Sequence, residues 1–156
     1  MKDIRLLLDN IRSVHNVGSL FRTAETLGIS KIYCLGTTPF PLDRFGRKRS
    51  DLAKVALGAE DLVAWEHLET TGDTIKTLKK SGFLIVSVEQ DKSSTDYKKV
   101  ELRERSLIIL GNEVEGVAKD LLKVSDILAE IPLAWKKESL NVSVAGAVAL
   151  FRMLDR

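Results

Sequence analysis

The sequence is poor in the residues from which disulfide scaffolds and zinc sites are built. Its 156 residues contain one cysteine, Cys34, and two histidines, His15 and His67. A single cysteine excludes an internal disulfide and is compatible with a reducing cytosol. The three residues are also too few for a usual zinc site, so we expect no metal.

Long apolar segments and an excess of one charge are also missing. The apolar runs fall far short of the ~20 residues that a spanning helix needs, and charges occupy the N-terminal positions where a signal peptide has its apolar core. We therefore expect a cytoplasmic protein with no membrane association. The 24 Lys and Arg against 22 Asp and Glu residues give a net charge of +2, too weak to indicate a polyanionic partner by bulk charge.

Three familiar loop motifs are absent. The sequence has no G-x-G, which excludes the dinucleotide-binding fingerprint and the glycine-rich loop of the common S-adenosylmethionine-binding fold. It has no G-x-S-x-G, the motif that presents the nucleophile of α/β-hydrolases.

What the sequence does contain is an alternation of short apolar runs with helical patterns. Strands are expected over residues 4–8, 31–35, 62–65, 83–88, 107–110 and 127–133. Helices are expected over residues 17–27, 74–80 and 140–154. Continuous apolar strands are typical of sheets buried on both faces, so we predict an α/β, three-layer sandwich with a mostly parallel sheet of five to six strands. Length and composition predict a single domain over residues 1–156, and sheets of this kind bind ligands at the carboxyl ends of their strands.

The first predicted strand is followed by a polar loop over residues 10–18. Asn16 is expected to cap the next helix, because its side-chain oxygen can accept a free backbone N–H. Arg22 lies four residues after Gly18, on the same side of the helix, and we expect the glycine to leave space above the arginine. The alternative is an ordinary capped helix with a solvated arginine.

A second loop, residues 111–116, follows the apolar run that ends at Leu110. Gly111 and Gly116 bracket an acidic turn and permit close approach of the backbone to a ligand. The Lys-Ser/Thr of a phosphate loop is missing, so a neutral or cationic ligand suits this loop better. The alternative is an ordinary turn between a strand and a helix.

A third loop, residues 131–141, precedes the last predicted helix. Ser139 is expected to be the N-cap, and Asn141 is unusual in the first turn because Asn is a poor helix former. Small residues follow at helical spacing, which indicates either core packing or a subunit interface: Val142, Ala145, Gly146 and Ala149.

Basic residues concentrate in one segment, where Arg44, Arg47, Lys48 and Arg49 surround Phe45. Cations beside an aromatic ring are the side chains that an RNA contact needs. We expect these four residues to bind RNA. The alternative is a solvated basic loop.

Taken together, the three loops resemble the three signature motifs of the SpoU (TrmH) family of the SPOUT superfamily, which contains RNA 2′-O-ribose methyltransferases. The resemblance lies in residues 16–24, residues 110–116, and residues 131–133 with 139–145. Each fragment is weak alone, but the three occur in the right order, each after a predicted strand. One departure is His15, where many members have proline.

The resemblance implies a fold with a deep C-terminal trefoil knot, and a homodimer whose active site is completed across the interface. It implies S-adenosyl-L-methionine as cofactor, S-adenosyl-L-homocysteine as product, and RNA as substrate. We expect no accessory RNA-binding domain of the kind that larger relatives carry, and this expectation favours tRNA over rRNA.

The resemblance also implies roles for the motif residues. Arg22 would bind phosphate and polarise or deprotonate the 2′-hydroxyl; the other catalytic positions are Asn16, Glu113, Ser139 and Asn141. The cofactor-binding positions would be Glu89, Leu110, Gly111, Ile131 and Leu140. Two alternatives stay open: an inactive RNA-binding or assembly protein that kept the fold, and a small-molecule α/β protein of flavodoxin type, which does not explain the third motif.

Overall fold

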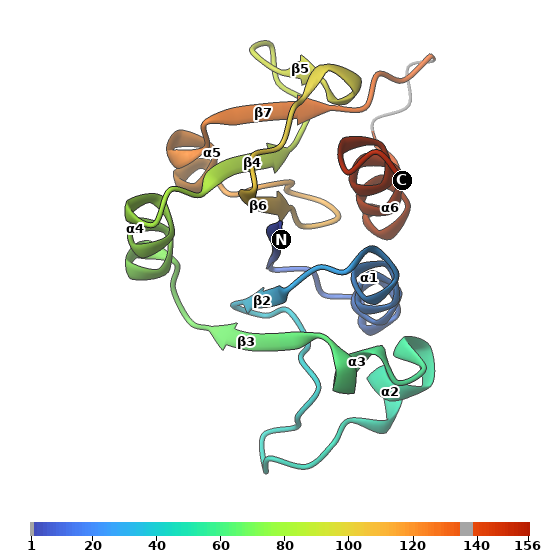
Figure 1. Cartoon of the computed structure of the whole chain (residues 1–156). Coiled ribbons are helices and arrows are strands. Elements are labelled where there is room, and N and C mark those ends of the chain that lie inside the picture. The colour runs from blue at the N-terminus through green and yellow to red at the C-terminus, as the bar shows by residue number, and fades with distance from the viewer. Residues whose placement is uncertain (1, 135–138) are drawn as a thin grey trace.

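The computed structural model describes residues 2–134 and 139–156, and seven parallel strands form its middle layer (Figure 1). The strands are β1 (Asp3–Asp9), β2 (Lys31–Leu35), β3 (Ala64–Leu68), β4 (Leu84–Val88), β5 (Thr95–Asp96), β6 (Arg105–Leu110) and β7 (Ile127–Glu130). Their order across the sheet is β3-β2-β1-β6-β4-β7-β5, and every strand pairing is parallel.

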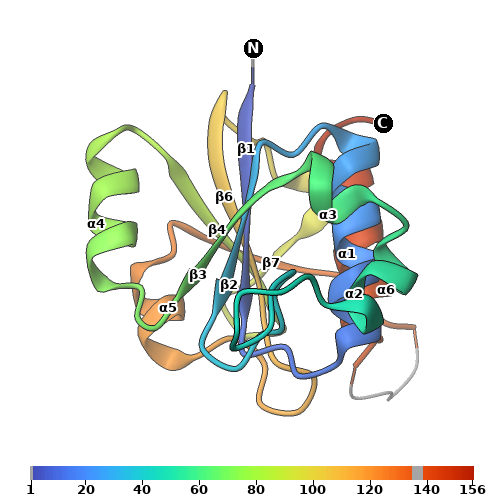
Figure 2. The ribbon, with the colours of Figure 1, turned by 90° about the horizontal axis from the view of Figure 1, so that it is seen from below.

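Helices cover both faces of the sheet, as Figures 1 and 2 show. They are α1 (Val14–Leu27), α2 (Ser50–Ala56), α3 (Ala59–Leu62), α4 (Gly72–Lys80), α5 (Lys119–Val124), α6 (Val142–Met153) and the 3₁₀ turn η1 (Tyr97–Lys99). Helices α1, α2, α3 and α6 lie on one face, and α4 and α5 lie on the other. The predicted three-layer α/β class is confirmed.

The sheet differs from the prediction in its details. It has seven strands rather than five or six, because the two-residue β5 carries no apolar signal. The strand expected over 127–133 ends at Glu130, before Pro132, and proline cannot donate a ladder hydrogen bond. The strand expected over 62–65 begins at Ala64, because Leu62 still belongs to α3.

Two hydrophobic clusters explain why the strands are continuous apolar runs. In β1, Leu6 and Leu8 point into the cluster beneath α1 and α6, whereas Leu7 points into the cluster beneath α4 and α5. Side chains alternate across a strand, so a strand buried on both faces is apolar at most of its positions. Each fully buried leucine contributes about 1.5–3 kcal/mol to stability.

Helix α1 begins three residues earlier than predicted. Its N-cap is Ser13, whose hydroxyl accepts a hydrogen bond from the Asn16 backbone N–H at 3.2 Å, so the expectation that Asn16 is the cap was wrong. Gly18 does not leave space above Arg22 either. A Cβ at Gly18 would lie 2.7 Å from the Val55 Cβ, so this glycine lets α1 pack closely against α2.

Helix α6 begins at Val142, and its N-cap is Asn141 rather than the predicted Ser139. The Asn141 side-chain oxygen accepts hydrogen bonds from the backbone N–H groups of Ser143 and Val144, which satisfies two of the free donors at the helix start. The small residues of α6 serve core packing, because a Cβ at Gly146 would approach Leu20 and Leu110 to 2.8 Å.

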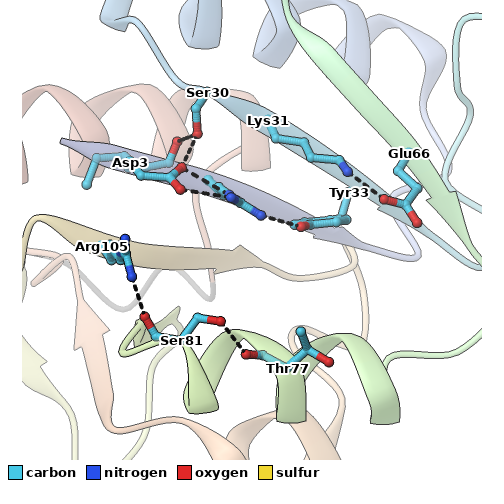
Figure 3. Close-up of polar contacts among 10 residues, drawn as sticks. Asp3, Ser30, Lys31, Tyr33, Glu66, Thr77, Ser81 and Arg105 are labelled. Carbon is cyan, nitrogen blue, oxygen red and sulfur yellow. Dashed lines mark hydrogen bonds and ion pairs between the residues drawn. The ribbon is translucent and has the colours of Figure 1, made fainter. Parts of the chain in front are cut away.

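A polar network holds the amino ends of the strands (Figure 3). Arg5 donates to both oxygens of Asp3, at 3.0 and 2.8 Å, and to the Tyr33 hydroxyl at 2.8 Å. The hydrogen bond from Arg5 holds the pKa of Asp3 below its usual range. Lys31 and Glu66 form an ion pair of 2.6 Å between β2 and β3. The network fixes the relative positions of the strands at their amino ends, whereas the long loops lie at their carboxyl ends.

The predicted trefoil knot depends on how the chain passes from β7 to α6. That passage includes residues 135–138, which lie outside the described residues, so the knot stays a prediction. In the part of the chain that the structure describes, no helix has the length and apolar character to cross a membrane.

Candidate active site

A cavity opens where the loops after β4, β6 and β7 meet the start of α6. Its empty space measures about 620 Å³, part of it open to solvent. The loops after β1, β2 and β6 lie at the same end of the molecule, the lower end in Figure 2. The expectation that the loops at the carboxyl ends of the strands form the site therefore agrees with the location of this cavity.

All five residues that we expected to bind the cofactor line this cavity: Glu89, Leu110, Gly111, Ile131 and Leu140. Apolar side chains make up much of the remaining wall: Val88, Leu133, Val142 and Ala145. The polar side chains are Glu89, Gln90, Asn112, Glu113 and Ser139. The wall thus combines apolar side chains with two carboxylates, which suits a ligand with a flat apolar part and a positive charge.

Two glycines bring the backbone close around the cavity. A Cβ at Gly111 would lie 2.3 Å from the carbonyl carbon of Gly116 and the nitrogen of Val117. Gly116 has a φ of +71° and lies against Glu89, whose carboxylate oxygen a Cβ would approach to 2.1 Å. The loop closes on itself through hydrogen bonds of 3.0 Å between Asn112 and Gly116 in both directions. A side chain at Gly111 would therefore displace backbone, and one at Gly116 would displace the Glu89 carboxylate.

Glu89 holds the β6 loop in place as well as lining the cavity. One of its carboxylate oxygens accepts a hydrogen bond from the Val117 backbone N–H at 2.8 Å, and the other accepts from the Gln90 N–H at 2.9 Å. A carboxylate with both oxygens bonded to backbone amides is fixed in orientation.

Three of the predicted catalytic side chains form one chain of hydrogen bonds. The Asn16 amide donates to Glu113 Oε1 at 3.1 Å, and the Asn141 amide donates to Asn16 Oδ1 at 3.1 Å. Asn16 is 7% exposed, so its amide has little access to water and depends on these partners. The chain joins all three predicted motifs, whose residues are 97 and 125 positions apart in the sequence.

Glu113 is the acceptor at the end of this chain. Burial would raise the pKa of its carboxyl group, but hydrogen bonds from its own backbone, the Asn16 amide, and the backbone N–H groups of Arg12 and Ser13 hold the pKa below its usual range. The last two donors lie 3.3 Å from the carboxylate. Glu113 is therefore a carboxylate at neutral pH and ties the β1 loop to the β6 loop.

We expect Glu113→Gln to destabilise the protein by about 1–3 kcal/mol, because a charged acceptor is lost from several donors. The melting temperature should fall by roughly 2–12 °C. Because the folded-state pKa of Glu113 is lowered, its contribution is present above the unfolded-state pKa and is lost as the pH falls through the folded-state value. Thermal unfolding from neutral to acidic pH should therefore show the difference between variant and wild type shrinking as the pH falls.

The control is Glu115→Gln, two residues along the same loop on an exposed side chain. A Glu115 variant as destabilised as the Glu113 variant would show that the loss reflects loop charge and not these hydrogen bonds.

Arg22 and Ser139 lie apart from this chain. Ser139 is at the cavity wall. Arg22 is exposed on α1, beside a shallow hollow formed with Ser19, Thr23, Thr26 and Phe151, and it does not line the cavity. Within one copy of the chain, the structure thus brings together Asn16, Glu113 and Asn141 but places Arg22 on another surface.

The basic segment carries less free charge than its sequence suggests. Arg47 pairs with Asp43 at 2.9 Å, Arg49 pairs with Asp51 at 2.7 Å, and Lys48 pairs with Glu60 at 3.2 Å and with Asp61. Among the described residues, Arg44 alone of the four has no carboxylate partner.

Sequence reasoning missed the buried residues that position the loops. The Asn112 amide donates to the Asn10 carbonyl at 2.6 Å, and Asp9 accepts from the Ala118 N–H at 2.7 Å. Thr38 is also buried and bridges the Leu8 carbonyl and the Ile11 N–H. The only signal for them was a polar residue at or within three positions of the end of an apolar strand, which fits an ordinary turn equally well. No group of three or more metal-ligating side chains occurs within residues 2–134 and 139–156.

Comparisons with known proteins identify a family and several related methyltransferases. The family model described as the SpoU rRNA Methylase family matches residues 3–151. A tRNA (guanosine(18)-2′-O)-methyltransferase of Aquifex aeolicus is 26% identical over 150 residues, covering 96% of this chain and 68% of that protein. A 23S rRNA (guanosine-2′-O-)-methyltransferase of Pseudomonas aeruginosa is 29% identical over 149 residues, covering 96% of this chain and 57% of that protein.

A solved structure agrees in fold. The AdoMet-bound rRNA methyltransferase from Sinorhizobium meliloti superposes with a TM-score of 0.86 at 26% identity, covering 98% of this chain and 56% of that one. The chain thus spans between 56% and 68% of the length of these three proteins.

Proposed function

The chain belongs to the SpoU rRNA methylase family, and from this premise we propose that it transfers a methyl group from S-adenosyl-L-methionine to a ribose 2′-hydroxyl of tRNA or rRNA. The observation that carries the proposal is a cavity lined by residues of the second and third motifs, to which the first motif is tied by the hydrogen bonds from Asn141 to Asn16 and from Asn16 to Glu113. A protein that only bound RNA would not need this arrangement.

The cavity suits S-adenosyl-L-methionine in chemistry. Leu110, Ile131 and Leu140 offer apolar surface for an adenine ring, while Glu89 and Glu113 place negative charge near a cationic ligand. Gly111 and Gly116 remove the side chains that would otherwise fill the loop. When bound, this cofactor supplies an activated methyl group on a sulfonium sulfur.

The remaining residues act on the RNA. We assign to Arg22 the binding of a phosphate and the polarisation of the 2′-hydroxyl, because a guanidinium offers several donors to one anion. Ser139 adds a hydroxyl at the cavity wall, while Asn16 and Asn141, whose amides are hydrogen-bonded within the protein, hold the surrounding loops in place. Positioning of the hydroxyl close to the methyl group is the main contribution that such residues make.

A homodimer would bring Arg22 to the site. Val144, Val148 and Phe151 form an apolar stripe along α6 and are between 38% and 49% exposed. The stripe begins near Leu140 at the cavity and ends at Phe151, which lies beside Arg22 in the shallow hollow. A second copy seated on the stripe would place the Arg22 of one copy near the cavity of the other.

We expect Val148→Glu to weaken dimerisation at least ~100-fold, because it buries an unpaired charge in the interface. Methyl transfer should fall with it. Sedimentation velocity over a range of protein concentrations measures the change. The control is Leu62→Glu, which puts the same charge on an apolar residue that is 74% exposed on α3. A wild type that is monomeric at every concentration would contradict the shared site.

The proposal covers both RNA classes, because the relatives named above act on tRNA in one case and on 23S rRNA in the other. We also propose a cytoplasmic location, where both the RNA and the cofactor are found.

The test of the proposed activity is to incubate the purified protein with isotopically labelled S-adenosylmethionine and either total tRNA or total rRNA, and to map the labelled ribose by mass spectrometry. Calorimetry with the cofactor alone separates the alternatives, because an inactive RNA-binding protein that kept the fold would show no binding.

A further inference from the structure

The turn after β2, residues 41–49, is held by one carboxylate. Asp43 accepts hydrogen bonds from the backbone N–H groups of Phe45 and Arg47, at 2.8 and 3.0 Å, and from Arg47 Nε at 2.9 Å. Backbone hydrogen bonds close the turn at both sides, from Asp43 to the Arg47 carbonyl at 2.8 Å and from Arg49 to the Pro41 carbonyl at 2.9 Å. The turn is thus a preorganised structure.

This turn presents an aromatic ring to solvent. Phe45 is 66% exposed, and Gly46 after it adopts a φ of +74°, the left-handed conformation that lets the chain reverse directly behind the ring. Burying a phenylalanine stabilises a folded protein, and this fold leaves most of that stabilisation unused.

Two guanidinium groups accompany the ring. Those of Arg44 and Arg47 lie 4.7 and 5.0 Å from the Phe45 ring centroid. The charge of Arg47 is matched by Asp43, whereas Arg44 has no carboxylate partner among the described residues. The tip of the turn therefore combines an exposed aromatic face with one uncompensated positive charge.

That combination fits an unpaired nucleotide. A base offers a flat face that stacks on aromatic rings and guanidinium planes. The phosphate of the nucleotide offers a negatively charged partner for Arg44. Bases in a duplex already stack on their neighbours, so only bases in loops and single strands are available. The turn follows β2, whose carboxyl end lies at the same end of the sheet as those of β1 and β6 (Figure 2). Resting on the proposed function, we infer that Phe45 is a stacking platform for an unpaired base of the RNA substrate, with Arg44 on an adjoining phosphate.

The test compares RNA affinity of Phe45 variants with total tRNA as the probe. Phe45→Ala should weaken binding about 5- to 150-fold, the effect of losing one stacked base. Phe45→Leu should lose a similar amount because it is apolar but not aromatic, whereas Phe45→Trp should retain the affinity of the wild type. The slope of affinity against salt should stay the same in all three, and Arg44→Ala should reduce it by about one ion.

Further measurements on the same variants separate the possible failures. A fully paired RNA duplex should bind the wild type and Phe45→Ala equally, and an equal loss on the duplex would overturn stacking on an unpaired base. Wild-type tRNA affinity in Phe45→Ala or Phe45→Leu, with methyl transfer intact, would overturn the inference and leave the proposed function standing. A wild type that neither binds S-adenosylmethionine nor methylates RNA would overturn the proposed function itself.

Discussion

Arg22→Ala is expected to lower the rate of methyl transfer by about 10²–10⁴-fold, the usual contribution of a positioned group that handles a proton. Binding of S-adenosylmethionine should stay unchanged, because Arg22 does not line the cavity. Stability should stay within about 0.5 kcal/mol, because the side chain is exposed. Single-turnover methylation assays and calorimetry measure the two properties separately.

Thr26→Ala is the control, since Thr26 lines the same shallow hollow one helical turn further along α1. It should retain full activity. Arg22→Lys adds a second comparison: it keeps the charge but loses the planar set of donors, and we expect it to remain strongly impaired. Normal turnover by Arg22→Ala would remove Arg22 from the reaction.

The shared site can be tested by mixing two inactive chains. Ala145→Phe fills the cavity from the first turn of α6 and leaves Arg22 in place. If Arg22 serves the partner's cavity, a mixture of Ala145→Phe and Arg22→Ala chains contains dimers with one complete site, and roughly a quarter of the wild-type activity should return. If each chain uses its own arginine, mixing should restore nothing.

Gly111→Ala is expected to abolish cofactor binding and to destabilise the protein by about 3 kcal/mol or more, because the added methyl group meets backbone atoms that no rotamer change can move. The contacts would be 2.3 Å to both Gly116 and Val117. The melting temperature should fall by roughly 6–12 °C. Calorimetry with S-adenosylmethionine and thermal unfolding are the measurements.

Gly72→Ala is the matched control. Gly72 opens α4, and a Cβ there would have no neighbour within 4 Å. This variant should keep its cofactor affinity and be neutral or slightly more stable, as alanine favours a helix over glycine. Undiminished cofactor affinity in Gly111→Ala would show that the β6 loop does not enclose the ligand.

The fold could be predicted from the sequence because burial on both faces leaves a direct pattern. Runs such as residues 107–110 are apolar at every position, and the polar loops after them mark the carboxyl edge of the sheet. The strand β5 was not predicted, because its two residues have no apolar pattern. The helix caps were misplaced because Ser13 and Asn16, like Ser139 and Asn141, are both acceptable capping residues a few positions apart.

For the candidate site, the sequence indicated residues but not the contacts between them. The motifs identified Asn16, Glu113 and Asn141, but their mutual hydrogen bonds depend on three loops meeting in space, which one sequence does not encode locally. The outward position of Arg22 and the pairing of Arg47 with Asp43 are likewise results of packing. Composition counts charges but does not show which of them neutralise each other.

The order of strands has a consequence for how the protein is made. The central strand β1 pairs with β6, about a hundred residues later, and Asn16 meets Asn141. Contacts of such long range slow folding, because a large loop must close before they form. During synthesis on the ribosome, β1 therefore cannot form its pairing with β6 until β6 has emerged. The candidate active site also needs Asn141 at the start of α6, so it can assemble only after this helix has been synthesised.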